Sequence, residues 1–540
     1  MRGMRGSDGG WRVLVTDPLS DDGIERLRKF ADVHIREGLK EEELIEIIRS
    51  YDALIVRSGT KVAADVIEAG ADGRLKVIGR AGVGVDNIDV SAATEKGVLV
   101  VNAPEANTIS AAEHTIAMIL ALSRWIPSAN ASLKAGKWNR KKYMGVELNG
   151  KTLGIIGLGR IGAEVAKRAK AFGMRIIAYD PYISVEKARE IGASLVSFDD
   201  VLRRADFITV HTPLTDETYH LLNADAFDRM KEGVRVINCA RGGIIDESAL
   251  ADAIKRGKVA GAALDVFEEE PPSPENELIS LENVIVTPHL GASTEEAQRA
   301  SAIVIAEEVE RALKGEPVRY AVNMPYLEEE RWDVMKPYLT LSSKIGSLCA
   351  QLKPRLSRIM RLELTYEGIM SEDTKILTAS ALQGFLSNFV SGVNIVNAEV
   401  MARKMGIKVS ERRTKDVDMF KSLMSVSMHT EDGTVTEVSG TIFEDLGDEP
   451  RIVKINGYRI DAVPEEYMLI CFFIDRPRVI GPVCTILGDK GINIARMQVG
   501  RKEPGGEAIM VLNVDSQVDD ATIAEIRNVK NIVDVKLVKL

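Results

Sequence analysis

The sequence predicts an α/β protein with two doubly wound, Rossmann-like parallel-sheet domains, followed by an α+β domain and a ferredoxin-like domain. Three observations lead to this prediction. Short apolar runs alternate with helical patterns from Arg12 to Lys314. A glycine-rich turn stands between a strand pattern and a helix pattern at 157–162. The final segment follows the order strand, helix, strand, strand, helix, strand.

The first α/β unit is predicted from five apolar runs separated by helical patterns such as Asp22 to Phe30 and Glu41 to Arg49. The predicted strands are Arg12–Thr16, Val33–Ile35, Ala53–Arg57, Val77–Gly79 and Val98–Val101. A long helical stretch follows, from about Ser110 to Ala135. Ser110 and Glu113 have the spacing of a capping box, so we expect the helix to begin there.

A second α/β unit begins at Lys151, and a helical stretch from Thr294 to Lys314 carries the chain away from its sheet. Its predicted strands are Thr152–Gly157, Arg175–Tyr179, Phe207–Val210, Arg235–Asn238, Ala262–Leu264 and Val284–Val286. We therefore expect a discontinuous first domain of residues 11–105 and 295–325 around a second domain of residues 106–294. Ligands of such sheets bind at the carboxyl ends of the strands, in the cleft between the domains.

The glycine turn predicts a dinucleotide site. Gly157 permits the tight turn, Gly159 allows the backbone to approach a pyrophosphate, and Gly162 allows close packing of helix on strand. The helix that follows presents free amides and a positive dipole end to phosphate. Asp180 ends the next strand, where a carboxylate can bind the ribose 2′-hydroxyl and repel a 2′-phosphate. NAD is therefore the predicted cofactor, in preference to NADP.

The chain after residue 325 divides into two parts. Three prolines at 317, 325 and 337 surround an acidic run, which indicates a linker. Residues 326–460 mix strand and helix patterns without a catalytic motif, and residues 465–540 form the predicted ferredoxin-like domain.

The charge and cysteine content exclude several functions. The formal net charge is −10 and the isoelectric point about 5.5, which is opposite to the basic face of a nucleic-acid-binding protein. The four cysteines form no metal-binding spacing, so we expect reduced thiols, no metal site and a cytoplasmic location. No apolar run approaches the ~18 residues of a membrane helix, so no membrane contact is expected.

Three polar residues at strand ends of the second unit have the chemistry of hydride transfer from a secondary alcohol. His289 is a candidate base for the hydroxyl proton. Glu270 can orient the imidazole through its other nitrogen, and Arg241 can hold a substrate carboxylate with its planar guanidinium. Each alone is more often structural, but their joint position downstream of a dinucleotide turn favours catalysis.

These segments make the chain resemble the D-2-hydroxyacid dehydrogenase family from about residue 11 to 325. The resemblance is carried by Gly79–Asp89, Gly157–Gly162, Asn238–Gly243 and Pro288–Ala292. It implies that the catalytic Arg, Glu and His of the family correspond to Arg241, Glu270 and His289. In the branch of the family with similar C-terminal extensions, the implied reaction oxidises 3-phosphoglycerate to 3-phosphohydroxypyruvate with NAD, the entry step to serine.

The resemblance also implies ligand contacts. The implied cofactor contacts are Val83, Gly157, Gly159, Arg160, Ile161, Gly162, Asp180, Thr212, Cys239, Asp265, His289, Gly291 and Ala292. The implied substrate contacts are Arg57, Ser58, Arg80, Gly82, Arg140, Lys141 and Arg241. Arg57 and Arg80 end strands of the first domain, where they can face the cleft and meet a phosphate. By resemblance, the segment around Arg140 and Lys141 reaches the active site of a neighbouring subunit, and the assembly is a homotetramer.

The last domain resembles the ACT domain, a regulatory module that binds amino acids, and residues 326–460 resemble the intervening domain found with it. Asp475 and Asn493 are candidate ligands for an L-serine effector. The family pattern has a glycine where Arg478 stands, which would alter the effector pocket.

Two alternatives share many of these features. A glyoxylate or hydroxypyruvate reductase would use the same catalytic trio, but the additional cations and the C-terminal domains argue against it. An NAD-sensing corepressor-like binding protein would use the same fold, and the acidic charge argues against that function.

Overall fold

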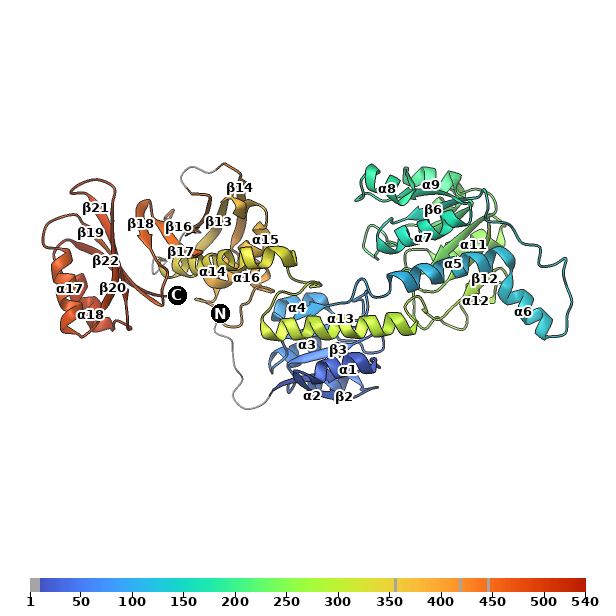
Figure 1. The fold of residues 1–540 in the computed structure, drawn as a ribbon, viewed down its shortest axis with the longest axis horizontal. Helices are drawn as coiled ribbons and strands as arrows, with labels where there is room; N and C mark the ends of the chain where they lie inside the picture. The colour runs from blue at the N-terminus through green and yellow to red at the C-terminus, as the bar shows by residue number, and fades with distance from the viewer. Residues whose placement is uncertain (1–9, 354–356, 417–419, 444–446) are drawn as a thin grey trace.

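The computed structural model describes residues 10–353, 357–416, 420–443 and 447–540. The described residues form four sheets, of five, seven, six and four strands. The five-stranded sheet lies in the middle of the molecule, the seven-stranded sheet on one side of it, and the six- and four-stranded sheets on the other (Figure 1). The predicted fold class is confirmed.

The first sheet is parallel throughout, with the order β2-β1-β3-β4-β5. Its strands are β1 (Trp11–Val15), β2 (Ala31–Ile35), β3 (Ala53–Val56), β4 (Val77–Arg80) and β5 (Leu99–Val101). Its helices are α1 (Asp21–Arg28), α2 (Glu41–Ile48), α3 (Ala64–Ala71), α4 (Val90–Lys96) and the returning α13 (Glu295–Lys314). A Cβ at Gly79 would lie 2.9 Å from side-chain atoms of Ile305 and Val309 on α13. This close contact of helix and strand fixes the position of Arg80, the next residue.

The second sheet is also parallel, with the order β12-β11-β10-β9-β6-β7-β8. Its strands are β6 (Thr152–Ile156), β7 (Arg175–Tyr179), β8 (Ser194–Leu195), β9 (Phe207–Val210), β10 (Val234–Asn238), β11 (Val259–Leu264) and β12 (Val284–Val286). Its helices include α7 (Arg160–Ala171), α8 (Val185–Ile191), α9 (Phe198–Arg204), α10 (Ala224–Arg229), α11 (Glu247–Lys255) and α12 (Glu277–Ser280). The strand order reverses between β6 and β9, and ligands of this fold bind at that switch point.

The predicted long helix at 110–135 is wrong in two respects. It is two helices, α5 (Thr108–Arg124) and α6 (Ile126–Lys134), separated by Trp125 in a left-handed conformation with φ 56°. Pro127 cannot donate to the carbonyl of Ser123, which accepts instead from the Val146 amide at 3.0 Å. The predicted capping box is also wrong, because Ser110 lies inside α5 and donates from its hydroxyl to the Gly291 carbonyl at 2.8 Å.

The predicted linker at 317–337 is also shorter than expected, because α14 (Glu329–Gln351) includes Pro337. Helix α14 lies against a six-stranded sheet of order β14-β13-β15-β16-β17-β18. These strands are β13 (Ile359–Gly368), β14 (Lys408–Thr414), β15 (Ser422–Thr430), β16 (Val435–Phe443), β17 (Glu449–Ile455) and β18 (Tyr458–Ala462). Helices α15 (Thr374–Leu386) and α16 (Ala398–Lys404) complete this part of the chain.

The final segment has the predicted ferredoxin-like order. Its antiparallel sheet, β20-β21-β19-β22, is built from β19 (Tyr467–Ile474), β20 (Ile494–Arg501), β21 (Glu507–Val514) and β22 (Ile532–Lys539). Helices α17 (Ile480–Asp489) and α18 (Asp520–Arg527) are the two crossover helices. Across the described ranges, no helix is long and apolar enough to cross a lipid bilayer.

Candidate active site

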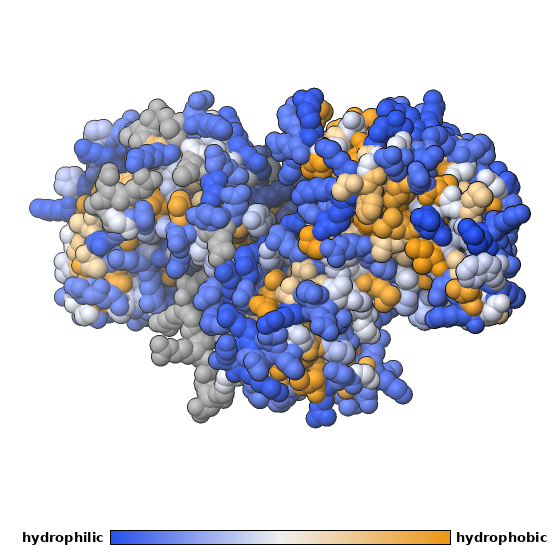
Figure 2. Space-filling view, turned by 45° about the vertical axis from the view of Figure 1, so that its right-hand side comes forward, coloured by the Kyte–Doolittle hydropathy of each residue, from blue (hydrophilic) through white to orange (hydrophobic). Residues whose placement is uncertain are grey.

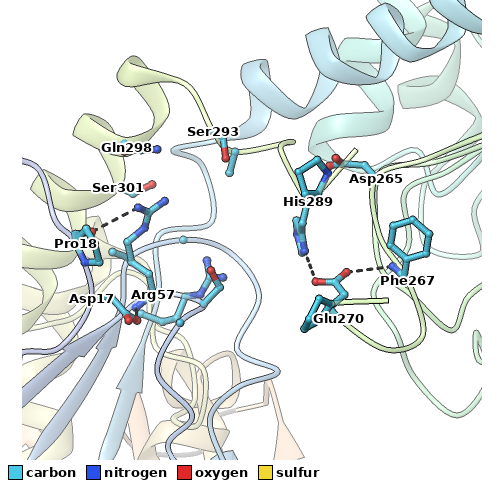
Figure 3. Close-up of a pocket in the computed structure, with 18 of the residues that line it drawn as sticks. Asp17, Pro18, Arg57, Asp265, Phe267, Glu270, His289, Ser293, Gln298 and Ser301 are labelled. Atoms are coloured by element: carbon cyan, nitrogen blue, oxygen red, sulfur yellow. Dashed lines mark hydrogen bonds and ion pairs between the residues drawn. The ribbon is translucent and has the colours of Figure 1, made fainter. Parts of the chain in front are cut away.

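Two cavities between the first and second sheets share His289 and Ala292 in their walls. The first has a volume of about 610 Å³ and the second about 550 Å³. Arg57 lies on one side of the first cavity, and His289 lies on the other (Figure 3). The second cavity is lined by residues that follow β6, β9 and β10, at the switch point of the second sheet. A small molecule in one cavity can therefore meet a cofactor in the other beside His289.

His289 and Glu270 form the pair that the sequence suggested. His289 Nδ1 lies 2.7 Å from Glu270 Oε2, and the Phe267 amide donates to Glu270 Oε1 at 3.1 Å (Figure 3). Burial opposes ionisation of Glu270, but the hydrogen bond and charge of His289 outweigh it and lower the pKa of that carboxyl. Since Nδ1 faces the carboxylate, Nε2 is the nitrogen available to a substrate hydroxyl.

The turn that presents His289 is held by the buried carboxylate of Asp265. Its oxygens accept hydrogen bonds from the amides of Leu290 and Gly291 at 2.7 and 2.8 Å, and from the Thr287 hydroxyl at 2.6 Å. Burial opposes ionisation here too, but the donors from His114 and Thr287 outweigh it and lower the pKa of Asp265. The position of His289 is therefore fixed by backbone contacts that do not involve its imidazole.

The loop after β3 is held by a second buried carboxylate, that of Asp17. Asp17 Oδ2 accepts from the amides of Arg57 and Thr60 at 2.5 and 3.1 Å, and Oδ1 accepts from the Thr60 hydroxyl at 2.9 Å. A Cβ at Gly59 would lie 2.7 Å from Asp17 Oδ1, so a side chain there would disturb these contacts. The loop consequently presents Arg57 and Ser58 to the first cavity.

Three guanidinium groups are distributed over the two cavities, and Arg80 lies close enough to Arg57 and Arg241 to be affected by their charges. Arg80 lines the first cavity and Arg241 the second, and Arg80 Nε is buried without a hydrogen-bond partner in the described part of the chain. Burial lowers the pKa of Arg80 to about 10, and repulsion from Arg241 and Arg57 adds to this effect. Such a cluster of like charges is suited to an anion that carries more than one negative charge.

The glycine turn has the backbone geometry that a dinucleotide needs. Gly157 has φ 91°, and a Cβ at Gly162 would lie 2.2 Å from the Gly157 carbonyl oxygen. At Gly159 a Cβ would meet nothing within 4 Å, so the start of α7 is open to a ligand phosphate. Asp180 Oδ2 accepts from the Leu158 amide at 2.8 Å, which places the carboxylate beside the turn.

The second cavity also contains polar atoms that lack partners. Thr212 Oγ1 and Asn107 Oδ1 are buried and have no hydrogen-bond partner among the residues that the structure describes. A ligand with hydroxyl and amide groups would satisfy them, and NAD carries both. Burial lowers the pKa of neighbouring His211 to about 4, so this imidazole stays neutral near pH 7. The cavity therefore fits the cofactor that the glycine turn predicts.

The structure brings most of the predicted ligand contacts into the two cavities. The first cavity is lined by Arg57, Ser58, Arg80, Gly82 and Asp265. The second is lined by Val83, Arg160, Ile161, Thr212, Cys239, Arg241, Gly291 and Ala292. Arg140 and Lys141 line neither cavity and are exposed in the segment after α6. Within one chain, these two cations are therefore not part of the site.

Several lining residues were not predicted. Asp17 lies two residues after the end of β1, so its position just past a strand is a signal for it in the sequence. Gln298 and Ser301 of α13 face the first cavity one helical turn apart (Figure 3). Asn107 and His211 lie beside the second cavity, and neither belongs to a motif that distinguishes it from a structural residue.

The two predicted effector residues of the ferredoxin-like domain already have partners. Asp475 Oδ2 accepts from Arg501 Nη1 at 3.1 Å, and Asn493 Nδ2 donates to Asp515 Oδ2 at 2.7 Å. Arg478 has φ 68°, a left-handed conformation that favours the glycine found there in the ACT pattern. The backbone at Arg478 is therefore compatible with a glycine, although the side chain departs from the pattern.

The fold and the site together define an NAD-dependent dehydrogenase of 2-hydroxy acids. Residues 116–291 match the family model "D-isomer specific 2-hydroxyacid dehydrogenase, NAD binding domain". A solved D-lactate dehydrogenase from Aquifex aeolicus, complexed with NAD and lactic acid, is 31% identical with a TM-score of 0.51. The match covers 56% of this chain and 96% of that one.

The C-terminal matches show which branch of the 2-hydroxyacid dehydrogenases the chain belongs to. Residues 334–456 match the "D-3-phosphoglycerate dehydrogenase intervening domain", and residues 467–531 match the ACT domain. The D-3-phosphoglycerate dehydrogenases of Methanocaldococcus jannaschii and Bacillus subtilis are each 48% identical over 98% of this chain and 100% of their own length. The chain belongs to the D-3-phosphoglycerate dehydrogenase family.

Proposed function

We propose that the protein oxidises 3-phosphoglycerate to 3-phosphohydroxypyruvate with NAD, the first step of serine biosynthesis from glycolysis. The observation that carries this proposal is that Arg57 and Arg80 line the cavity that contains the His289–Glu270 pair, while Arg241 lines the adjoining cavity that shares His289. A 2-hydroxy acid without phosphate needs one guanidinium for its carboxylate, whereas a substrate with a phosphate needs further cations at its other end.

The proposed roles follow from the two cavities. Residues 11–105 and 295–325 bind the substrate, with its phosphate at Arg57 and Arg80, and Arg241 of the second domain holds its carboxylate. Residues 106–294 bind NAD, which accepts a hydride from C2 when it is bound. His289 Nε2 takes the proton of the C2 hydroxyl, and Glu270 stabilises the resulting imidazolium through Nδ1.

An NAD-coupled assay tests the proposal directly. We expect NADH formation with 3-phosphoglycerate, and a kcat/KM for D-glycerate or D-lactate that is lower by about a hundredfold or more. Equal rates with phosphorylated and unphosphorylated acids would instead indicate a general 2-hydroxyacid reductase. No NADH formation with any 2-hydroxy acid would favour a binding protein. The same assay with L-serine tests regulation through the ACT domain.

Asp180 is proposed to set the preference for NAD over NADP. Asp180→Asn keeps an oxygen that can accept from the Leu158 amide, but it removes the charge that repels a 2′-phosphate. We expect the ratio of kcat/KM for NAD to that for NADP to fall at least about tenfold. Asp180→Ala should lower the same ratio and also weaken NAD, because the turn loses an acceptor. An unchanged ratio in both variants would assign cofactor choice to another group.

Assembly into a homotetramer is implied by the resemblance to the family, and an exposed apolar surface supports an interface between subunits. Apolar side chains gather on the right-hand lobe of the molecule in Figure 2. The exposed large apolar residues on α6 and in the following segment include Ile126, Leu133, Trp138 and Met144. An exposed patch of this kind typically marks a protein interface. Arg140 and Lys141 lie in the same segment, so an interface here would place them near a neighbouring subunit. We propose that this assembly acts in the cytoplasm.

A further inference from the structure

Arg241 is fixed at its backbone by the second sheet domain. Asn238 Nδ2 donates to the Arg241 carbonyl at 2.8 Å, and the Ala240 amide donates to Asn238 Oδ1 at 3.0 Å. These bonds set where the side chain starts but not where its guanidinium lies. A free arginine side chain has many rotamers and loses conformational entropy when it is ordered. The structure therefore has to supply a second restraint for the guanidinium.

That restraint comes from the opposite domain. Arg241 Nε donates to Asp86 Oδ2 at 3.0 Å, and Nη1 donates to the Ala240 carbonyl at 2.6 Å. A Cβ at Gly84 would lie 1.9 Å from Arg241 Nη2, so the loop backbone closely approaches the guanidinium. Of the five guanidinium hydrogens, Asp86 accepts the one on Nε and the Ala240 carbonyl accepts one on Nη1. Both hydrogens on Nη2 and the second on Nη1 remain available to a ligand. The loop between β4 and α4 is thus built around the side chain of Arg241.

The neighbouring residue holds the other end of the site. Asn87 Nδ2 donates to the carbonyl oxygens of Arg57 and Thr60 at 2.7 and 2.6 Å. Both carbonyls belong to the loop that presents Arg57 and Ser58 to the first cavity. Two successive residues of one loop therefore contact the two cationic ends of the cleft, Asp86 at Arg241 and Asn87 at the Arg57 loop.

We propose that Asp86 is a positioning residue for Arg241, and that it orients the guanidinium for the substrate carboxylate while Asn87 independently orders the phosphate-binding loop. This inference rests on the proposed function, because it assigns the carboxylate to Arg241 and the phosphate to Arg57. Asp86 carries a negative charge and cannot itself bind an anionic substrate. Its contribution passes through the geometry of Arg241.

Two probes separate the two ends of the site in the full-length enzyme. D-glycerate carries the carboxylate and hydroxyl without the phosphate, and inorganic phosphate represents the other end alone. Both are measured as competitive inhibitors against 3-phosphoglycerate. Asp86→Ala is expected to raise the inhibition constant of D-glycerate about three- to fivefold and to leave that of phosphate unchanged. Asn87→Ala is expected to show the reverse pattern, and it serves as the matched control for general damage to the loop.

Two further variants test whether Asp86 acts through Arg241. Asp86→Asn keeps an acceptor oxygen and should recover most of the lost D-glycerate affinity. In an Arg241→Lys background, which lacks the Nε donor edge, Asp86→Ala should cause no further loss of D-glycerate affinity. The proposal is overturned if Asp86→Ala weakens both probes equally, weakens neither, or has the same effect in both backgrounds. If wild type does not oxidise 3-phosphoglycerate, the proposed function fails first, so the two failures are distinguishable.

Discussion

Replacement of His289 by alanine is expected to lower kcat for 3-phosphoglycerate oxidation by about a thousandfold or more. The hydroxyl proton then has no acceptor at Nε2, and Glu270 has no imidazole to orient. The affinity for NAD should stay within about twofold, because the amides of Leu290 and Gly291 are held by Asp265 at 2.7 and 2.8 Å and not by the imidazole. Steady-state kinetics combined with NADH titration measures both quantities.

The conformation of His289 calls for a second variant. Its φ of 54° is left-handed, and alanine adopts that conformation at a cost of about 1–2 kcal/mol. Asparagine tolerates it better and cannot accept a proton from the substrate, so His289→Asn separates a strained turn from a missing base. Both variants should lose turnover equally. A His289→Asn enzyme that retained more than about a tenth of the wild-type rate would remove His289 from the proposed proton transfer.

Glu270→Gln provides a milder comparison. The glutamine keeps the size of the side chain and one acceptor oxygen, but it loses the charge that stabilises an imidazolium. Since the pKa of Glu270 is lowered, its carboxylate stays ionised through the pH range in which a free glutamate titrates. Its support of His289 is therefore lost only when the pH falls further, through the lowered pKa. We expect kcat near neutral pH to fall by about a hundredfold in Glu270→Gln, less than in the two His289 variants.

Much of the fold could be predicted because hydrophobic periodicity and the glycine turn are local signals. The strands of both parallel sheets lie within a few residues of their predicted positions, although the two-residue strand β8 is too short to leave a pattern. The break between α5 and α6 at Trp125 shows what local sequence patterns do not predict. Pro127 is a visible signal for it, but the conformation of Trp125 also depends on the Val146 amide reaching Ser123 from another part of the chain.

In the candidate site too, the features that local sequence signals predict differ from those that depend on contacts between distant parts of the chain. Arg241, Glu270 and His289 follow strands of one sheet, so the rule that ligands bind at strand ends predicts that they meet. The contact between Asp86 and Arg241 crosses two domains, and it depends on how those domains lie relative to each other. No local pattern encodes that placement. The lowered pKa of Arg80 similarly results from burial and from charges that are distant in sequence.

Replacement of Arg241 by methionine is expected to lower kcat/KM for 3-phosphoglycerate by about a thousandfold. Methionine keeps an unbranched side chain about as long as the stem of arginine, but it removes the donors that hold the carboxylate, and it leaves Asp86 without its Arg241 partner. Arg241→Lys keeps the charge without the planar fork, so we expect an intermediate loss of about a hundredfold. NADH titration of each variant should give the wild-type affinity within about threefold, which separates a substrate defect from a cofactor defect.

The same variants decide which way the substrate lies. If the carboxylate meets Arg241 and the phosphate meets Arg57 and Arg80, inhibition by inorganic phosphate should survive in Arg241→Met almost unchanged. Arg57→Met should do the opposite, weakening phosphate while D-glycerate inhibits as in wild type. If Arg241→Met instead weakens phosphate and spares D-glycerate, the phosphate lies at Arg241 and C2 no longer faces His289 Nε2. That reversed orientation would leave the proton without its acceptor, so active enzyme with this inhibition pattern would contradict the proposed geometry.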